Sequence, residues 1–147
     1  MTIKQLLQSK VVLMDANNET YSFLHSDLDW RNLSADECTF PIVYVEVPIK
    51  YRVKTSVTGY KETTYIVVVF FMYKSELDNN PDQQEEIFVK AENAQKQFEI
   101  LWDSDSDNIS SWVSGECTMF QHVTNADLSG VMMPLEITLR NNDSVCL

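Results

Sequence analysis

The chain of 147 residues is poor in glycine and in positive charge. It has 3 glycines, far below the roughly 7% average usage in proteins. Loops that hold phosphate need several closely spaced glycines, so Walker and Rossmann fingerprints are excluded. Its 11 bases and 22 acids give a net charge of −11. A free-standing nucleic-acid binder depends on clustered Lys and Arg, so we expect no sequence-specific nucleic-acid binding.

Cysteines and long apolar runs are also scarce. Cys38, Cys117 and Cys146 are odd in number and widely spaced, with no CxxC pair. This pattern predicts reduced thiols inside a cell and neither a disulfide framework nor a zinc knuckle. The longest apolar stretch is residues 65–73, whereas a membrane-spanning helix needs about 20 residues. Residues 1–10 lack the apolar segment of a secretory signal. The sequence therefore predicts a soluble intracellular protein without a membrane contact.

The remaining composition is that of an ordinary globular protein, with 44% hydrophobic and 22% charged residues. This is enough apolar material for one core, and no repeat or linker interrupts it. We therefore predict a single domain over residues 1–147. Apolar residues at helical spacing predict a short helix that begins at Ile3. Residues 21–25 fit a short strand, and residues 27–37 fit an irregular helical turn or two.

A long hairpin over residues 42–74 is the clearest feature of the pattern. Strict alternation from Pro41 predicts a first strand with one face on the core and the other in water or against a partner. Pro48 removes a ladder donor from this strand and indicates an edge or a bulge. The second strand, residues 63–74, is apolar on both faces and is expected to be central. If the core covers only part of this length, the tip around residues 55–61 projects.

A second helix and a closing hairpin complete the predicted fold. Apolar residues at 3.6-residue spacing predict a long amphipathic helix over residues 83–102, packed on the sheet. Strands are expected at residues 116–123 and 131–140, where Pro134 again indicates an edge or a bulge. This order of elements predicts an α+β domain with a mainly antiparallel sheet.

The acidic segment after the long helix has the spacing that opens a calcium loop. Asp103, Asp105 and Asp107 alternate as the first three ligands would. The glycine expected at the sixth position is Asn108, and the glutamate expected at the twelfth is Ser114. Since both strong constraints fail, a solvated loop is the preferred interpretation.

Residues suited to catalysis are sparse. Nucleophilic catalysis needs a base, usually histidine, and the chain has only His25 and His122. It contains no GxSxG nucleophile elbow. The acids include no pair whose spacing favours acid–base chemistry. We therefore predict a protein that is not an enzyme and that holds no metal and no cofactor.

Four of the 11 bases lie between residues 50 and 61. Lys50, Arg52 and Lys54 share one strand face, and Lys61 follows the turn. One interpretation is a solubilised edge strand, because lysines block edge pairing. A second is a positive hairpin that docks on the negative surface of a neighbour, which includes another copy of the chain. A third is a nucleic-acid contact, which the net charge opposes.

The docking interpretation defines a candidate protein interface. Its members on the hairpin and on the acidic loop are Lys50, Arg52, Lys54, Thr58, Gly59 and Lys61, with Asp103, Asp105 and Asp107. In this hypothesis the basic face of one copy meets the acidic loop of the next, as a heterologous contact requires.

The order and size of these elements resemble the tail-terminator and neck-ring (head–tail connector) proteins of tailed bacteriophages. The matching parts are the strands 42–54 and 62–74, the helix 83–102 and the closing hairpin 116–140, which make up about half of the chain. The closing stretch, residues 127–139, also looks like small structural proteins of phages and prophages. The resemblance brings no catalytic residues with it.

This resemblance implies a non-enzymatic virion protein that assembles in the host cytoplasm. It implies a ring, often sixfold or twelvefold, between head and tail, with copies of the chain and neighbouring neck or tail proteins as partners. DNA would at most pass through the lumen, where a negative wall keeps it mobile. A terminator, a connector and another tail component all fit this pattern. The alternative function is a small intracellular adaptor that binds a protein or a small ligand between sheet and helix.

Overall fold

The computed structural model describes residues 2–25, 39–55, 57–59, 61–75, 80–121 and 128–139. The helices are α1 (Ile3–Val12), the 3-10 turn η1 (Ala16–Asn18) and α2 (Pro81–Asp103). The strands are β1 (Ser22–Leu24), β2 (Ile42–Val45), β3 (Lys50–Thr55), β4 (Lys61–Lys74), β5 (Ile109–Ser114), β6 (Thr118–Phe120) and β7 (Leu128–Leu139). The predicted turn at residues 27–37 lies outside the described residues.

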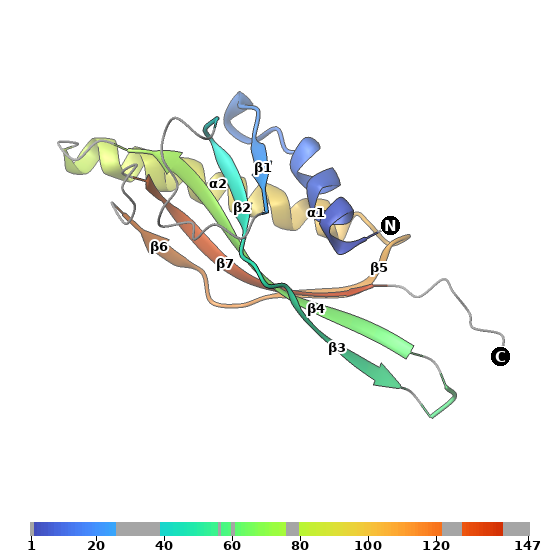
Figure 1. Ribbon diagram of the computed structural model, residues 1–147. Helices are drawn as coiled ribbons and strands as arrows, with labels where there is room; N and C mark the ends of the chain where they lie inside the picture. The colour runs from blue at the N-terminus through green and yellow to red at the C-terminus, as the bar shows by residue number, and fades with distance from the viewer. Residues whose placement is uncertain are drawn as a thin grey trace.

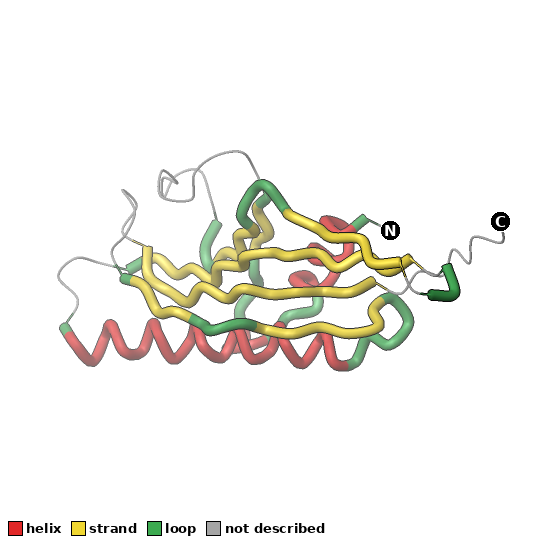
Figure 2. The backbone as a smooth tube through the Cα atoms, turned by 90° about the horizontal axis from the view of Figure 1, so that it is seen from below, coloured by secondary structure: helices red, strands yellow, loops and turns green. Residues whose placement is uncertain are grey.

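The seven strands form one sheet in the order β1-β2-β4-β7-β5, with β3 also paired to β4 and β6 to β7. Only β1 and β2 are parallel among the described strand pairs. The helices α1 and α2 lie on one side of this sheet (Figure 1), and α2 runs along its length (Figure 2). The predicted α+β fold with a mainly antiparallel sheet is confirmed.

Both helices begin where the sequence places a cap. Thr2 and Gln5 form a capping box before α1, and Asn80 and Gln83 form one before α2. Pro81 occupies the first turn of α2, where its missing N–H costs no hydrogen bond. The predicted long helix 83–102 is confirmed and is extended slightly at both ends.

The sheet is apolar on both faces along β4, as predicted for a central strand. Towards the helices, Val67, Val69 and Phe71 join the main core. Towards the opposite side, Phe70 and Met72 join a second, smaller cluster. Because β4 lies between β2 or β3 on one edge and β7 on the other, both of its edges are also hydrogen-bonded.

The first strand of the long hairpin is interrupted. Residues 46–49, with Pro48, separate β2 from β3, although both pair with β4. Glu46 N–H still bonds to a β4 carbonyl at 3.0 Å, so the missing proline donor breaks the ladder only locally. The predicted continuous strand is therefore two strands that share a partner.

Of the two predicted alternatives for Pro134, an edge strand is wrong, and an irregularity of the bulge type is observed: residues 115–117 lie opposite only residues 133–134. Pro134 lies in β7, between β4 and the pair β5 and β6. Its carbonyl accepts a hydrogen bond of 2.8 Å from Gly115 N–H, at the gap between β5 and β6. Since a strand residue directs its N–H and C=O to the same neighbour, the proline ring faces the gap where the ladder is already interrupted. The sequence did not predict β5, and the predicted strand 116–123 shortens to β6.

Candidate protein-interaction surface

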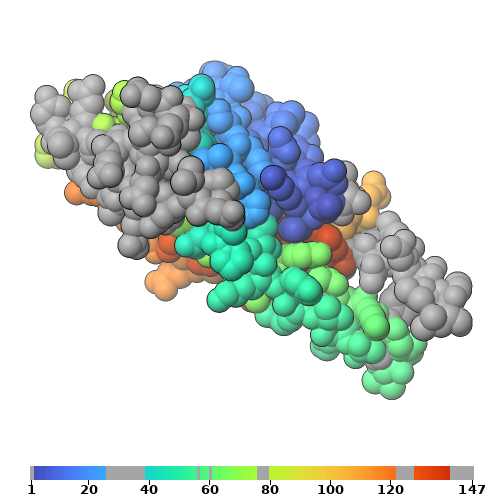
Figure 3. All heavy atoms as spheres, in the orientation of Figure 1, coloured from blue at the N-terminus to red at the C-terminus, as the bar shows by residue number. Residues whose placement is uncertain are grey.

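The hairpin of β3 and the first half of β4 extends past both helices (Figures 1 and 3). All six residues of β3 are exposed. In the described part of the chain β3 pairs only with β4, so its outer edge of N–H and C=O groups is open. At the turn, Gly59 has a φ of 84°, a conformation that suits glycine.

One face of this hairpin is basic. Lys50, Arg52 and Lys54 pair in register with alternate residues of β4, which places them together on the side away from the helices. The guanidinium of Arg52 donates to both carboxylate oxygens of Glu136, at 3.0 and 3.4 Å. Both side chains of this pair are about half exposed, and such pairs contribute roughly 0.2–1 kcal/mol. The structure therefore brings the three strand bases together, with Arg52 paired to Glu136 and with Glu62 directly opposite Lys54 on the same face.

The opposite face of the hairpin is apolar and exposed. Tyr51 and Val53 point to the helix side but lie beyond the reach of α1 and α2, so their side chains are 65% and 53% exposed. Tyr51 contacts the ring of Tyr65 at 5.8 Å between centroids. Val57 at the turn is fully exposed. These exposed apolar groups therefore lie on one projecting element that neither helix covers.

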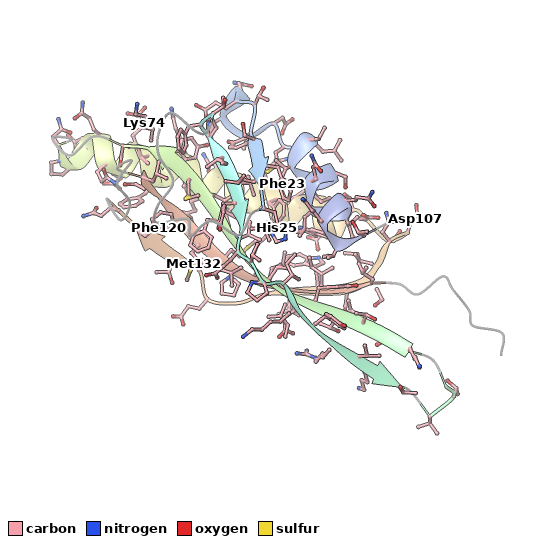
Figure 4. The ribbon with its side chains drawn as sticks, viewed as in Figure 1. Phe23, His25, Lys74, Asp107, Phe120 and Met132 are labelled. Carbon is pink, nitrogen blue, oxygen red and sulfur yellow. The ribbon has the colours of Figure 1, made fainter. Side chains whose placement is uncertain are left out.

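The three aspartates of the acidic loop have separate roles. Asp103 accepts a 2.8 Å hydrogen bond from the indole N–H of Trp112. Asp105 accepts from the backbone and side chain of Asn108. Asp107 is exposed (Figure 4). Among the described residues, no three His, Cys, Asp or Glu side chains are grouped to hold a metal ion.

Asp105 is also paired with Lys10 of α1, which ties the first helix to the end of α2. The two side chains are 7% and 10% exposed, and the ammonium lies 5.3 Å from the ring centroid of Trp102. Burial raises the pKa of Asp105, but the hydrogen bonds from Lys10 and Asn108 outweigh it and hold the pKa below its usual value. The only indication of this ion pair in the sequence was Lys10 itself, a base on the apolar face of the predicted first helix.

His25, which lies in the described ranges, is hydrogen-bonded to the backbone. His25 Nδ1 bonds to the Val45 carbonyl at 3.0 Å, next to β2 (Figure 4). His122, Cys38 and Cys146 lie outside the described residues. Cys117 is exposed.

A groove that the sequence analysis missed lies between the N-terminal half of α2 and β6. Its volume is about 520 Å³. Its lining residues are Pro81, Gln84, Glu85, Phe88, Val89, Glu92, Met119 and Gln121. In the sequence, the residue that could have indicated this groove was Val89, because it is an apolar residue on the exposed side of an amphipathic helix.

The chain matches no protein-family model and no curated protein sequence. Neither helix in the described ranges is long and apolar enough to cross a membrane.

Proposed function

We propose that the chain is a non-enzymatic structural protein of a phage virion, a ring subunit that joins head and tail through protein–protein contacts. The observation that carries this proposal is the projecting β3–β4 hairpin, which is exposed on both faces and along one edge. Its partners are copies of the chain and neighbouring neck or tail proteins, and it assembles in the host cytoplasm.

The hairpin is costly to an isolated subunit. The last described β4–β7 pair is Thr63 with Leu139, so beyond it residues 54–55 and 61–62 form a ribbon of only two described strands. Such a ribbon has no core of its own and is marginally stable in water. Tyr51, Val53 and Val57 leave apolar surface in solvent that a partner would bury, at about 25 cal/mol for each Å². A protein contact at the hairpin offsets this cost and explains why the strands extend past the helices.

The charge distribution fits a ring around DNA. Residues 50–61 carry four bases and no acid, while the whole chain has a net charge of −11. If the bases are used in contacts between subunits, the remaining surface is strongly negative. A negative lumen wall repels phosphate and lets DNA slide, with no sequence-specific nucleic-acid binding and no membrane contact.

The test removes the tip of the hairpin without disturbing its register. Val53 and Thr63 are directly opposed, so an Asn-Gly turn in place of residues 54–62 closes a shorter hairpin. We expect the wild type to elute as a multiple of its 17.0 kDa mass in chromatography with light scattering, and the shortened variant to remain monomeric. Electron microscopy should show rings for the wild type only.

A charge variant complements the deletion. Lys50→Glu with Lys54→Glu should weaken assembly, while the matched reversal of two exposed lysines elsewhere, Lys4→Glu with Lys74→Glu, should not. A wild type that stays a 17.0 kDa monomer and is missing from purified virions of the source would overturn the proposed function.

The groove between α2 and β6 favours a second candidate, a small adaptor that binds a protein or small ligand there. Such an adaptor would be monomeric, and its properties would not depend on the hairpin tip.

A further inference from the structure

The groove between α2 and β6 has an apolar interior that is open to solvent. Phe88 and Val89 from α2 and Met119 from β6 contribute its apolar surface. Val89 and Met119 are each about half exposed. At about 520 Å³, the groove is in the size range of sites that bury several ligand groups.

Gln84 is an unsatisfied polar group in the wall of this groove. It is 8% exposed, and neither its amide oxygen nor its amide nitrogen has a hydrogen-bond partner in the described ranges. A buried amide without partners is destabilising. Its acceptor and donor match the N–H and C=O that the edge of an extended strand presents.

The helix end that forms the groove is negatively charged. Glu85 lines the groove. Asp82 and Glu86 lie in the same first turns of α2 without lining it, and no base occurs before Lys90. Their charge exceeds the half unit of positive charge at a helix N-terminus. The other acid of the groove, Glu92, is already neutralised by Lys96 at 2.9 Å. The groove therefore fits an extended, apolar and basic partner.

The tip of the hairpin in this same chain has those properties. Val53 and Val57 are exposed apolar groups. Lys50 and Lys54 make no ion pair with any described residue. The outer edge of β3 supplies unpaired N–H and C=O groups. Thus the tip complements the groove in apolar surface, in charge and in hydrogen bonding.

A hairpin does not reach the groove of its own molecule. Met119 of β6 pairs with Val131 of β7, which pairs with Phe71 of β4. The tip is at Lys61, the other end of the same strand and about 33 Å away at 3.3 Å per residue. Figure 1 shows the tip and the N-terminal half of α2 at opposite ends of the molecule. Any contact between them joins two copies.

We propose that the hairpin tip of one copy docks in the α2–β6 groove of the next. This inference rests on the proposed function and names the acceptor surface of the ring. The contact is heterologous, since it joins two different surfaces, and it generates a ring when the rotation between copies closes. The acidic loop is a poorer acceptor, because Asp105 is paired with Lys10 and Asp103 with Trp112.

The test uses one variant in each surface and then mixes them. Val57→Asp places a charge on the tip that repels the acidic groove, and Val89→Trp fills the groove. Matched controls are Val12→Asp and Val113→Trp, which change valines that are also exposed but lie away from both surfaces. All four positions are exposed, so the variants should unfold within about 2 °C of the wild type.

We expect each surface variant to weaken self-association by about tenfold or more, as loss of a central apolar contact does. The controls should assemble as the wild type does. A 1:1 mixture of Val57→Asp and Val89→Trp retains one intact tip and one intact groove. It should therefore form a pair that is joined by one contact and capped at both ends, with twice the 17.0 kDa mass and nothing larger.

Two results separate the failure of this inference from that of the proposed function. If Val57→Asp prevents assembly but Val89→Trp assembles normally, the tip docks elsewhere and only the acceptor is wrong. If the wild type does not self-associate under any condition, the acceptor and the proposed function are both overturned. A groove that instead binds a small ligand or an unrelated peptide, with assembly unaffected, would also overturn the inference.

Discussion

The buried ion pair between Lys10 and Asp105 makes a quantitative prediction about how α1 is held. Lys10→Met removes the ammonium but keeps an unbranched chain against Trp102. It leaves the Asp105 carboxylate buried without its cation, and breaking a buried pair in this way costs about 3–5 kcal/mol. At about 2–4 °C for each kcal/mol, Tm at pH 7 should fall by roughly 6–20 °C.

The same variant has an expected pH dependence. The pKa of Asp105 is lower in the folded protein than its ordinary value, because the hydrogen bonds from Lys10 and Asn108 outweigh the effect of burial. A carboxylate with a lowered folded-state pKa stabilises above its unfolded pKa, and this contribution is lost as the pH falls through the folded pKa. In Lys10→Met the burial of Asp105 is opposed only by Asn108, so the variant protonates this carboxyl at a higher pH than the wild type does. The difference in Tm should therefore be largest at pH 7 and should shrink as the pH falls.

The assay is thermal unfolding followed by circular dichroism at several pH values. Lys96→Met is the matched control, since Lys96 pairs with Glu92 in solvent and such a pair contributes about 0.3–0.5 kcal/mol. Replacing both partners, with Lys10→Met and Asp105→Leu, should cost less than Lys10→Met alone. The reasoning is refuted if Lys10→Met melts within about 2 °C of the wild type at pH 7, or if the difference grows at low pH.

Other substitutions test the sheet, with urea unfolding as the measurement. Gly130→Ala should cost at least about 3 kcal/mol, because a methyl group there would lie 1.8 Å from a backbone oxygen of β4; Gly115→Ala, whose methyl would meet a proline ring at 3.2 Å, should cost about 1 kcal/mol or less. Arg52→Ala removes an exposed ion pair with Glu136 and should change stability by no more than about 1 kcal/mol. Tyr73→Phe removes a 2.8 Å bond to a second buried tyrosine hydroxyl and should cost about 1 kcal/mol. Equal losses at the two glycines would contradict the close approach of β4 and β7.

Periodicity predicted the elements with strong patterns and failed where a partner strand decides the structure. Apolar residues at 3.6-residue spacing predicted α2. Apolar residues on both faces of the strand predicted the central position of β4. The strand β5 is a short polar segment that is held in place by β7, so its own residues carry little β signal. Pro134 indicated an edge or a bulge, and the sequence could not decide between them because it does not show which strands lie on either side of β7.

The candidate interface was predicted in part. Alternation placed Lys50, Arg52 and Lys54 on one face because the side-chain period of a strand is fixed. The pairing of Lys10 with Asp105 joins residues far apart in the chain, and no local pattern reports such a contact. The groove likewise depends on β6 lying beside α2. The sequence therefore could not predict that Gln84 would be buried without a hydrogen-bond partner.

The lengths of the elements explain why the hairpin is left uncovered. The 23 residues of α2 extend about 35 Å at 1.5 Å per residue, whereas the 14 residues of β4 extend about 46 Å at 3.3 Å per residue. Because α2 runs along the sheet, the longer strand must pass beyond the helix (Figure 2). Alternation continues past that point, so Tyr51 and Val53 keep the pattern of core residues where no helix covers them. The apolar pattern of β3 thus continues beyond the reach of the helices, and the proposed contact between copies rests on this feature.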